Sequence, residues 1–149
     1  MNEVAAEEGW VSTSASKSLS GRPSKNTEPE LILRRALHAA GARFRLHRRL
    51  AKGCTPDLVL PSRHLAIFVD GDFWHGCPVH FPDRRIGGPN ASRWQAKFAA
   101  VRERDERSTR LAQESGWNVV RVWECEIRAD PTTVASRILA FPKARTLDR

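Results

Sequence analysis

Two aspartates stand at the ends of segments that we expect to be strands, where their carboxylates could bind a metal ion. Asp57 follows Pro56 at the head of the apolar stretch 58–60, and Asp70 ends the apolar run 65–69. Because neighbouring strands lie about 4.8 Å apart, the two carboxylates are expected to converge on one divalent cation. Oxygen ligands favour Mg²⁺, which takes one or two protein carboxylates together with substrate phosphate oxygens. For Asp57 alone, the plainer interpretation is a Pro-Asp turn.

A third carboxylate and a histidine extend this set. Glu30 lies on the first expected helix, where a helix-capping role and a role at the metal explain it equally well. His75 comes soon after Asp70, and an imidazole with an ordinary pKa of about 6.5 suits a general base that takes a proton from a water. Phe73 and Trp74 precede it, and they either pack in the core or wedge between DNA base steps.

Cysteine and histidine residues further along form half of a zinc-binding pattern. Cys77 and His80 have the C-x2-H spacing of two zinc ligands. Cys125, which follows an expected strand, is a third candidate, and the fourth ligand is open between Asp72 and Cys54. A zinc ion would explain how the surrounding loop, rich in proline and glycine, stays ordered. The alternative is three buried, unrelated thiols.

The charge of the chain indicates a polyanionic partner. Its 149 residues include 25 Lys+Arg against 17 Asp+Glu, so the formal net charge is +8. Nucleic acid is the leading candidate for such a partner. The helix expected from Ser92 to Gly116 is especially basic, and its cations form either a solvated face or a set of phosphate contacts. They are Arg93, Lys97, Arg102, Arg104, Arg107 and Arg110.

Several other classes of protein are disfavoured. The apolar runs fall short of the roughly 18 residues of a membrane span, and the acidic N-terminus lacks the apolar region of a signal peptide. Three cysteines form no disulfide framework, so we expect a cytoplasmic protein with no membrane partner. The length predicts one domain. Residues 1–22 are expected to be a disordered or loosely attached arm, and residues 23–149 a single domain.

The elements that must position these residues alternate between helix and strand. The first helix begins at Thr27, which forms a capping box with Glu30, and ends at Gly41. The basic helix has Ser92 and Gln95 as its capping box, and Asp130 caps a last short helix. The expected strands are residues 44–47, 55–60, 65–69 and 117–123, and residues 76–91 form a long loop. A mixed sheet flanked by helices, an α/β fold of the α+β type, is the natural layer arrangement.

Several motifs then occur in one order along the chain. They are Thr27-Glu28-Pro29-Glu30, Thr55-Pro56-Asp57, the block Asp70-Gly71-Asp72-Phe73-Trp74-His75, the helix with Trp94, Lys97 and Arg104-Asp105, and Val122-Trp123-Glu124-Cys125. From about residue 22 to residue 127 the chain resembles the very-short-patch-repair (Vsr) DNA mismatch endonucleases. The resemblance implies a restriction-endonuclease-like core of the PD-(D/E)xK superfamily with a zinc-held loop. It also implies Mg²⁺-dependent nicking of duplex DNA 5′ to the T of a T·G mismatch left by deamination of 5-methylcytosine.

The resemblance assigns roles to individual residues. Asp57 matches the metal-binding aspartate, Glu30 the glutamate near the site and His75 the catalytic histidine. Val69 falls where a backbone carbonyl contacts the metal. The remaining matches are Cys77, His80 and Cys125 as zinc ligands, and Phe73, Trp74 and Trp94 as aromatics that enter DNA. Apart from the resemblance, we expect Lys97 and Arg102 of the basic helix to contact the DNA backbone.

Three positions depart from the family's pattern. Asp72 stands where the family usually has a zinc-binding cysteine, so the zinc site would be Asp-Cys-His-Cys, weakened or empty. Asp70 replaces a histidine found in some relatives, and is therefore only an additional candidate ligand for Mg²⁺. Val101 replaces an asparagine that many members carry on the helix facing the mismatch, which bears on mismatch preference.

The sequence thus predicts a monomeric, Mg²⁺-dependent mismatch endonuclease acting in the cytoplasm on nucleoid-associated DNA. Functional coupling to a DNA cytosine methyltransferase and to a repair polymerase is expected. One alternative is a restriction-like nuclease of the same fold with a different DNA specificity. Another is a zinc-stabilised DNA-binding module without catalysis.

Overall fold

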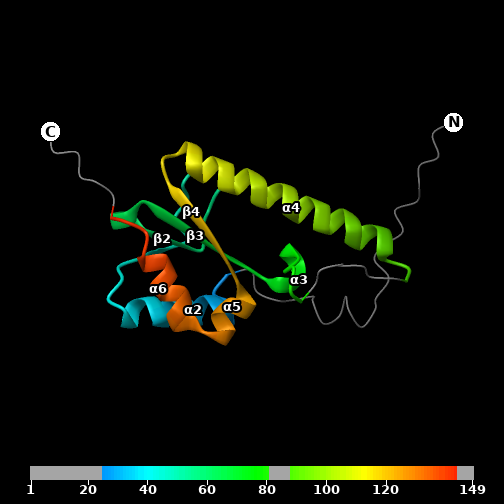
Figure 1. Cartoon of the computed structure of the whole chain (residues 1–149). Coiled ribbons are helices and arrows are strands. Elements are labelled where there is room, and N and C mark those ends of the chain that lie inside the picture. Colours follow the sequence, from blue (N-terminus) through cyan, green and yellow to red (C-terminus); the bar gives the residue numbers. More distant parts are fainter. Residues whose placement is uncertain (1–24, 81–87, 144–149) are drawn as a thin grey trace.

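A mixed four-stranded sheet forms the centre of the molecule (Figure 1). The computed structural model describes residues 25–80 and 88–143. The sheet order is β1-β2-β3-β4; the first two pairs are antiparallel, and β3 and β4 are parallel. The strands are β1 (Arg45–Leu46), β2 (Leu58–Leu60), β3 (Leu65–Asp70) and β4 (Asn118–Trp123). The expectation of a mixed sheet between helices is therefore confirmed.

Alternation along β3 divides its side chains between two hydrophobic cores. Leu65 and Ile67 belong to one core, and Ala66 and Phe68 belong to the other, because successive side chains in a strand point to opposite faces. Helices cover both faces, so β3 is buried over nearly its whole length, as its continuous apolar run predicts.

Three helices cover one face of the sheet: α2 (Glu28–Ala39), α5 (Glu124–Ala129) and α6 (Pro131–Leu139). The first helix ends as the sequence predicts, since Gly41 has a φ of 81° and the N–H of Ala42 donates to the carbonyl of Leu37. The cap of α6 is confirmed as well, because the Asp130 side chain accepts from the backbone N–H of Thr133 at 3.1 Å.

The long helix α4 (Ala91–Glu114) crosses the other face and extends beyond the sheet (Figure 1). Its C-terminal half packs on the core around Phe68 and Ala112. Gly116, with a φ of 87°, follows its end as the sequence predicts. The short helix α3 (Asp72–His75), which follows β3 directly, lies beside the middle of α4.

Several local expectations are wrong in detail. The capping box at the start of α2 does not form: Thr27 makes no side-chain cap, and Glu30 accepts from the N–H of Asn26 instead. The N-cap of α4 is Asn90, so Ser92 lies within the helix. The short helices α3, η1 (Pro61–Arg63) and α5 were not expected, because each is too short to show a helical period.

Part of the sequence-based interpretation falls outside the described residues. The N-terminal arm expected at residues 1–22 lies there, as do residues 81–87 of the long loop. Among the described residues, no helix combines the length and apolarity needed to cross a membrane.

Candidate functional site

Asp57 and Asp70 lie at the same edge of the sheet because β2 and β3 are antiparallel. Asp57 precedes the first residue of β2, and Asp70 is the last residue of β3. The Oδ2 atom of Asp57 accepts a hydrogen bond of 2.7 Å from the backbone N–H of Val69. The two aspartates are close enough for the charge of Asp70 to raise the pKa of Asp57. The two aspartates therefore lie near one another at this end of the sheet, and their shared binding of one cation stays a prediction.

The electrostatics of this edge suit a bound cation. Burial, followed by the charge of the neighbouring Glu30 carboxylate, raises the pKa of Asp57 to about 7 even though the Val69 N–H stabilises its charged form. Burial also raises the pKa of Asp70, against the opposing charges of His75 and Arg121. Glu30 is 3 % exposed and Asp70 5 %. Buried carboxylates held this close repel one another, and a divalent cation would relieve that repulsion.

Glu30 is held by basic side chains on its outer side. Its Oε2 atom lies 3.3 Å from Nη2 of Arg34 and 4.0 Å from Nε2 of His47. The same Arg34 nitrogen donates to Oδ1 of Asn26 at 2.7 Å. Glu30 therefore combines a structural role at the start of α2 with a position beside Asp57.

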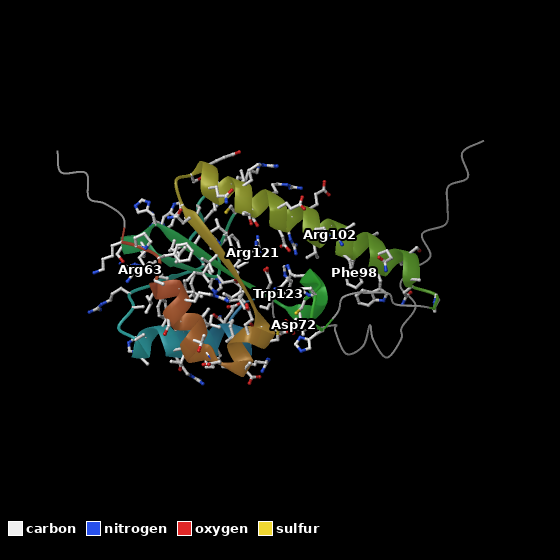
Figure 2. All side chains as sticks on the ribbon, viewed as in Figure 1. Arg63, Asp72, Phe98, Arg102, Arg121 and Trp123 are labelled. Carbon is white, nitrogen blue, oxygen red and sulfur yellow. The ribbon has the colours of Figure 1, made fainter. Side chains whose placement is uncertain are left out.

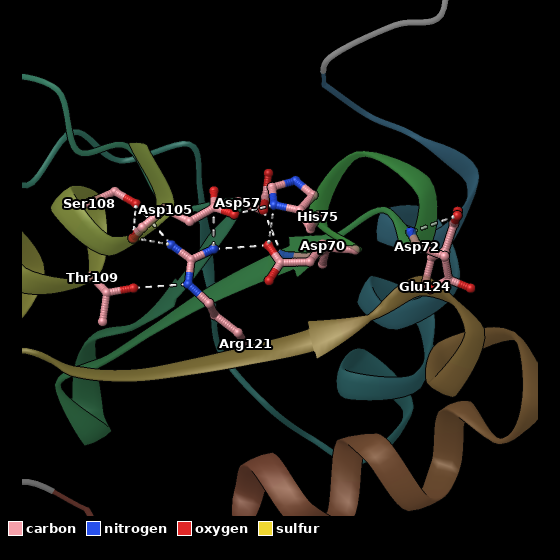
Figure 3. A network of polar contacts seen from close by, with 10 residues as sticks. Asp57, Asp70, Asp72, His75, Asp105, Ser108, Thr109, Arg121 and Glu124 are labelled. Atoms are coloured by element: carbon pink, nitrogen blue, oxygen red, sulfur yellow. Dashed lines mark hydrogen bonds and ion pairs between the residues drawn. The ribbon is translucent and has the colours of Figure 1, made fainter. Parts of the chain in front are cut away.

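His75 is positioned by α3 and by a residue of α4. Its Nδ1 atom is hydrogen-bonded to Oδ2 of Asp105 and lies 3.6 Å from Oδ1 of Asp70 (Figure 3). A carboxylate accepts, so Nδ1 carries the proton and Nε2 is the basic nitrogen of the neutral ring. This is the arrangement of a histidine prepared to take a proton from a water.

Asp105 was not among the predicted site residues, although the sequence contains a signal for it. The buried stripe of α4 passes through Trp94, Phe98, Ser108 and Ala112, and Asp105 falls at the same helical spacing. A charged residue on a buried stripe indicates a paired or functional group.

Arg121 was also missed. It projects from β4 toward α4 (Figure 2), and its Nη1 donates to Oδ1 of Asp70 at 2.9 Å. The sequence does contain a signal for Arg121, because it is the one charged residue in the otherwise apolar segment 119–123. In the sheet, Arg121 pairs with Phe68 of β3.

A second group of metal-binding side chains gathers where α3 meets α5. Asp72, Cys77, His80 and Cys125 each offer a ligand atom, and these atoms all lie within 4.8 Å of one another. The three candidate zinc ligands and Asp72 are therefore brought together. Cys54 lies elsewhere, fully buried, with its thiol donating to the carbonyl of Ser108 at 3.2 Å. Of the two candidates for the fourth ligand, the structure brings only Asp72 to the group.

The spacing of these four side chains fits a tetrahedral ion. The Sγ atoms of Cys77 and Cys125 are 3.7 Å apart, close to the roughly 3.8 Å edge of a tetrahedron with Zn–S bonds of about 2.3 Å. Nδ1 of His80 lies 3.7 Å from Sγ of Cys77 and 3.1 Å from Oδ2 of Asp72. Four protein ligands would close such a site to substrate, as in structural zinc centres.

The protonation of the two thiols differs. Burial raises the pKa of Cys125 to about 12, with the nearby Asp72 adding to the effect. Burial also opposes ionisation of Cys77, but hydrogen bonds from the backbone of His80 and Val79 prevail and lower the pKa of that thiol. Cys77 is therefore the thiol more easily converted to the thiolate that binds a metal.

The residues expected to contact DNA lie on α3 and α4. Lys97 and Arg102 are exposed on α4, and Figure 2 shows Arg102 on this helix. Trp94 is 2 % exposed and stacks on Phe98 with ring centroids 5.9 Å apart, so it does not project from the surface here. Its insertion into DNA stays a prediction that requires the side chain to move. Phe73 and Trp74 lie in α3, and their side chains are outside the described part of the chain.

Comparisons with known proteins agree on one class of enzyme. The family described as DNA mismatch endonuclease Vsr matches residues 10–80. The type II nicking enzyme V.XorIIP of Xanthomonas oryzae pv. oryzae is 48% identical over 107 residues, covering 70% of this chain and 74% of that protein. V.NaeI of Lentzea aerocolonigenes, another type II nicking enzyme, is 36% identical over 115 residues, with 74% and 68% covered. The DNA mismatch endonuclease Vsr of Escherichia coli K12 is 31% identical over 113 residues, with 76% and 70% covered.

Proposed function

Because this chain belongs to the Vsr family of DNA endonucleases, we propose that it nicks one strand of duplex DNA 5′ to the T of a T·G mismatch, with Mg²⁺ as its catalytic metal. Membership makes the chain a hydrolase that cuts DNA, and it implies a restriction-endonuclease-like fold and the use of a divalent metal. The observation that carries the proposal is that Asp57 lies near Asp70, whose Oδ1 atom is 3.6 Å from Nδ1 of His75, and that His75 is in turn paired with Asp105.

Asp57 holds the metal in this proposal, with the backbone carbonyl of Val69 as a further ligand. At such a site Mg²⁺ supplies polarisation of the scissile phosphate and a lower pKa for a bound water. Glu30 adds negative charge beside Asp57 from α2, while Arg34 limits the repulsion between the two carboxylates. Asp70 is the further candidate ligand for the metal, and its ion pair with Arg121 competes with that role.

His75 acts as the general base. Asp105 accepts a hydrogen bond from the Nδ1–H group of His75, which leaves the lone pair of Nε2 free to take a proton from water. The Asp105 carboxylate also stabilises the imidazolium that forms after this proton transfer. Because Asp105 comes from α4 and His75 from α3, the pair depends on the packing between these two helices.

DNA is held by basic side chains of α4 in this proposal. Lys97 and Arg102 are exposed there and would contact phosphates, which fixes the position of the duplex without reading its sequence. Phe73, Trp74 and, after movement, Trp94 would enter the DNA beside the mismatch. Val101 lies on the same helix and would influence mismatch preference.

The group Asp72, Cys77, His80 and Cys125 holds a structural Zn²⁺ in this proposal. The spacing of the ligand atoms supports it, and so does the cross-connection between elements: the N–H of Asp72 donates to Glu124, and the N–H of Cys125 donates to Asp72. The site would clamp α3 to α5 and thereby hold His75 in place.

The remaining parts of the proposal concern the cellular setting. We propose a monomer, with residues 23–149 as the endonuclease domain, that acts in the cytoplasm on nucleoid-associated DNA. Mismatches would arise where a DNA cytosine methyltransferase had modified the site, and a repair polymerase would extend the nicked end.

Cleavage of end-labelled duplexes tests the proposal. The duplexes carry T·G, a matched T·A pair or an abasic site, each with Mg²⁺ or with EDTA, and the product ends are mapped on both strands. We expect a Mg²⁺-dependent nick 5′ to the mismatched T only. Equal nicking of the matched duplex would exclude mismatch specificity. It would favour the second candidate function, a nicking enzyme of different DNA specificity, which the names of the type II relatives support.

A further inference from the structure

We propose that Arg121 is a positioning residue, whose guanidinium holds Asp70 and Asp105 around His75 in the place that a second cation would otherwise take. The inference rests on the proposed function of His75 as general base and extends it to a residue that touches neither substrate nor metal.

The guanidinium of Arg121 is held from three directions (Figure 3). Its Nε donates to Oγ1 of Thr109 at 2.9 Å, and Nη1 donates to Oδ1 of Asp70 at 2.9 Å. Its Nη2 donates to the carbonyl of Asp105 at 2.9 Å and to Oγ of Ser108 at 2.8 Å. One side chain of β4 thus binds the end of β3 and a full turn of α4.

The same guanidinium compensates the charge of the carboxylates beside His75. Asp70, His75 and Asp105 place ligand atoms within 4.8 Å of one another, which by spacing alone would suit a metal ion. Nη1 of Arg121, however, lies 2.9 Å from Asp70 and 3.7 Å from Oδ1 of Asp105. A fixed positive charge therefore already lies between these carboxylates, which leaves the Asp57 edge as the place for the catalytic cation.

Stability alone does not account for an arginine at this position. Replacing both partners of a buried ion pair by apolar side chains of similar volume is often neutral or stabilising, whereas removing one partner alone leaves an uncompensated charge and is destabilising. Position 121 lies in a strand flanked by valines and pairs with Phe68, whose ring lies 4.3 Å below the guanidinium carbon, so an apolar side chain would pack well there. What an apolar residue could not do is hold Asp70 and the Asp105 turn of α4 at once.

The planar shape of the guanidinium matters as well as its charge. Contacts to Thr109, Asp70 and Asp105 lie at separate edges of one rigid plane, and the plane itself stacks on Phe68. A lysine carries the charge as a single point on a flexible chain and can reach only part of this set. The Arg121→Lys variant should therefore rescue function only in part.

The test compares Arg121→Met and Arg121→Lys with a matched control, Arg137→Met. Arg137 forms an ion pair with Glu126 on the opposite face of the sheet, so the control loses the same charge away from the site. Single-turnover nicking is measured at saturating protein, together with DNA Kd and Tm, on whichever duplex the wild-type protein nicks. We expect Arg121→Met to slow nicking by about 10- to 100-fold, the usual effect of losing a supporting hydrogen-bond partner, with DNA Kd nearly unchanged. Its Tm should fall because Asp70 loses its charged partner, so nicking is compared at a temperature well below the Tm of every variant. The nicking rate of Arg121→Lys should lie between those of wild type and Arg121→Met, and the rate of Arg137→Met should equal that of wild type.

A double-mutant cycle identifies the route of the effect. If Arg121 acts through Asp105, the Arg121→Met/Asp105→Asn double variant should nick no more slowly than Asp105→Asn alone. Three outcomes would each overturn the proposal: rate losses that multiply fully in the double variant, an unchanged rate in Arg121→Met, or a rate loss fully accounted for by unfolded protein at the assay temperature or by weaker DNA binding. If Arg121→Met does not fold, Thr109→Val removes only the Nε contact and should still slow nicking several-fold.

A measurement without DNA separates this inference from the proposed function. The Nδ1 proton of His75, assigned in NMR spectra by its absence in His75→Ala, should appear downfield in wild type and shift upfield in Arg121→Met. An unchanged resonance would overturn the positioning role whether or not the protein nicks a T·G duplex. Failure of the wild-type protein to nick T·G, with this resonance shifted in the variant, would overturn only the proposed function.

Discussion

The Oδ2 atom of Asp57 accepts a hydrogen bond of 2.7 Å from the backbone N–H of Val69, which ties the residue before β2 to the next-to-last residue of β3. This bond fixes the carboxylate at the sheet edge while leaving its other oxygen for a cation. Because the bond is to the backbone, the register of β2 and β3 fixes the position of this oxygen.

Asp57→Asn should abolish Mg²⁺-dependent nicking, because the metal loses its charged ligand while the amide oxygen can still accept from Val69. The DNA Kd should change little. Nicking is measured on labelled duplex with protein in excess. Retained cleavage by this variant would exclude Asp57 as the metal ligand.

The same variant should change the pH dependence of stability in the metal-free protein. Folding raises the pKa of Asp57 to about 7, so its protonated form is favoured in the folded state, and the stability it contributes is lost as pH rises through 7. Asp57→Asn should therefore have the higher Tm at pH 8 in EDTA. Added Mg²⁺ should raise the Tm of wild type but not of the variant, and an equal rise in both would place the metal elsewhere.

His75→Ala should slow single-turnover nicking by roughly 10²-fold or more, the scale expected for a positioned general base. Asp105→Asn should also slow nicking, because an amide no longer stabilises the imidazolium. An unchanged rate in His75→Ala would remove His75 from the mechanism. Arg128→Ala, which loses only an exposed ion pair with Glu28, serves as the control.

Purified protein should contain one zinc per chain, measured by elemental analysis. Cys125→Ser should lose most of the zinc and lower Tm, since the clamp between α3 and α5 opens. Cys54→Ser is the matched control, because Cys54 lies apart from the cluster and should leave the zinc content unchanged. Asp72→Cys should bind zinc more tightly than wild type, because thiolate is the preferred ligand. Zinc loss in the Cys54 variant but not in the Cys125 variant would refute the assignment.

Arg102→Gln should weaken DNA binding and reduce its salt dependence. The slope of log K against log salt is negative, and one lost phosphate contact reduces its magnitude by about 0.9 on duplex DNA. The slope is measured by fluorescence anisotropy between roughly 50 and 200 mM salt, a range over which phosphate contacts change DNA affinity strongly. A slope equal to that of wild type would show that Arg102 does not contact a phosphate.

Asp130→Ala should lower Tm at neutral pH, because α6 loses the side chain that caps it. Hydrogen bonds from Thr133 lower the pKa of Asp130 in the folded protein, so its contribution is present above the unfolded value near 3.8 and is lost as pH falls below it. The difference in Tm between the two proteins should begin to shrink as pH falls below about 4 and should be smallest below the lowered pKa of folded Asp130. A Tm difference independent of pH would show that the ionised carboxylate is not what stabilises the cap.

The local elements followed from the sequence because their signals are short-range. Gly41 and Gly116 mark helix ends with positive φ, and the apolar run that ends at Asp70 is a buried strand. Asp57 at the head of its strand, and Cys77 with His80 at zinc spacing, could be identified for the same reason: the pattern lies within a few residues. The helix starts were predicted unevenly: Thr27 is the N-cap of α2 but forms no capping box, whereas the N-cap of α4 is Asn90, two residues before the expected Ser92.

What the sequence by itself determined was therefore the identity of the carboxylates, the histidine and the thiols, and the longer strands and helices, but not the short helices α3 and α5 that carry His75 and Cys125. Only the tertiary structure decided that Asp105 meets His75 and that Arg121 lies against Asp70, because α4 must first pack across the sheet before side chains from α3, α4 and β4 share one volume. It also placed Asp72 rather than Cys54 beside Cys77. The physical reason is that hydrogen bonds within a turn depend on neighbouring residues, whereas contacts between distant segments depend on how buried apolar faces pack.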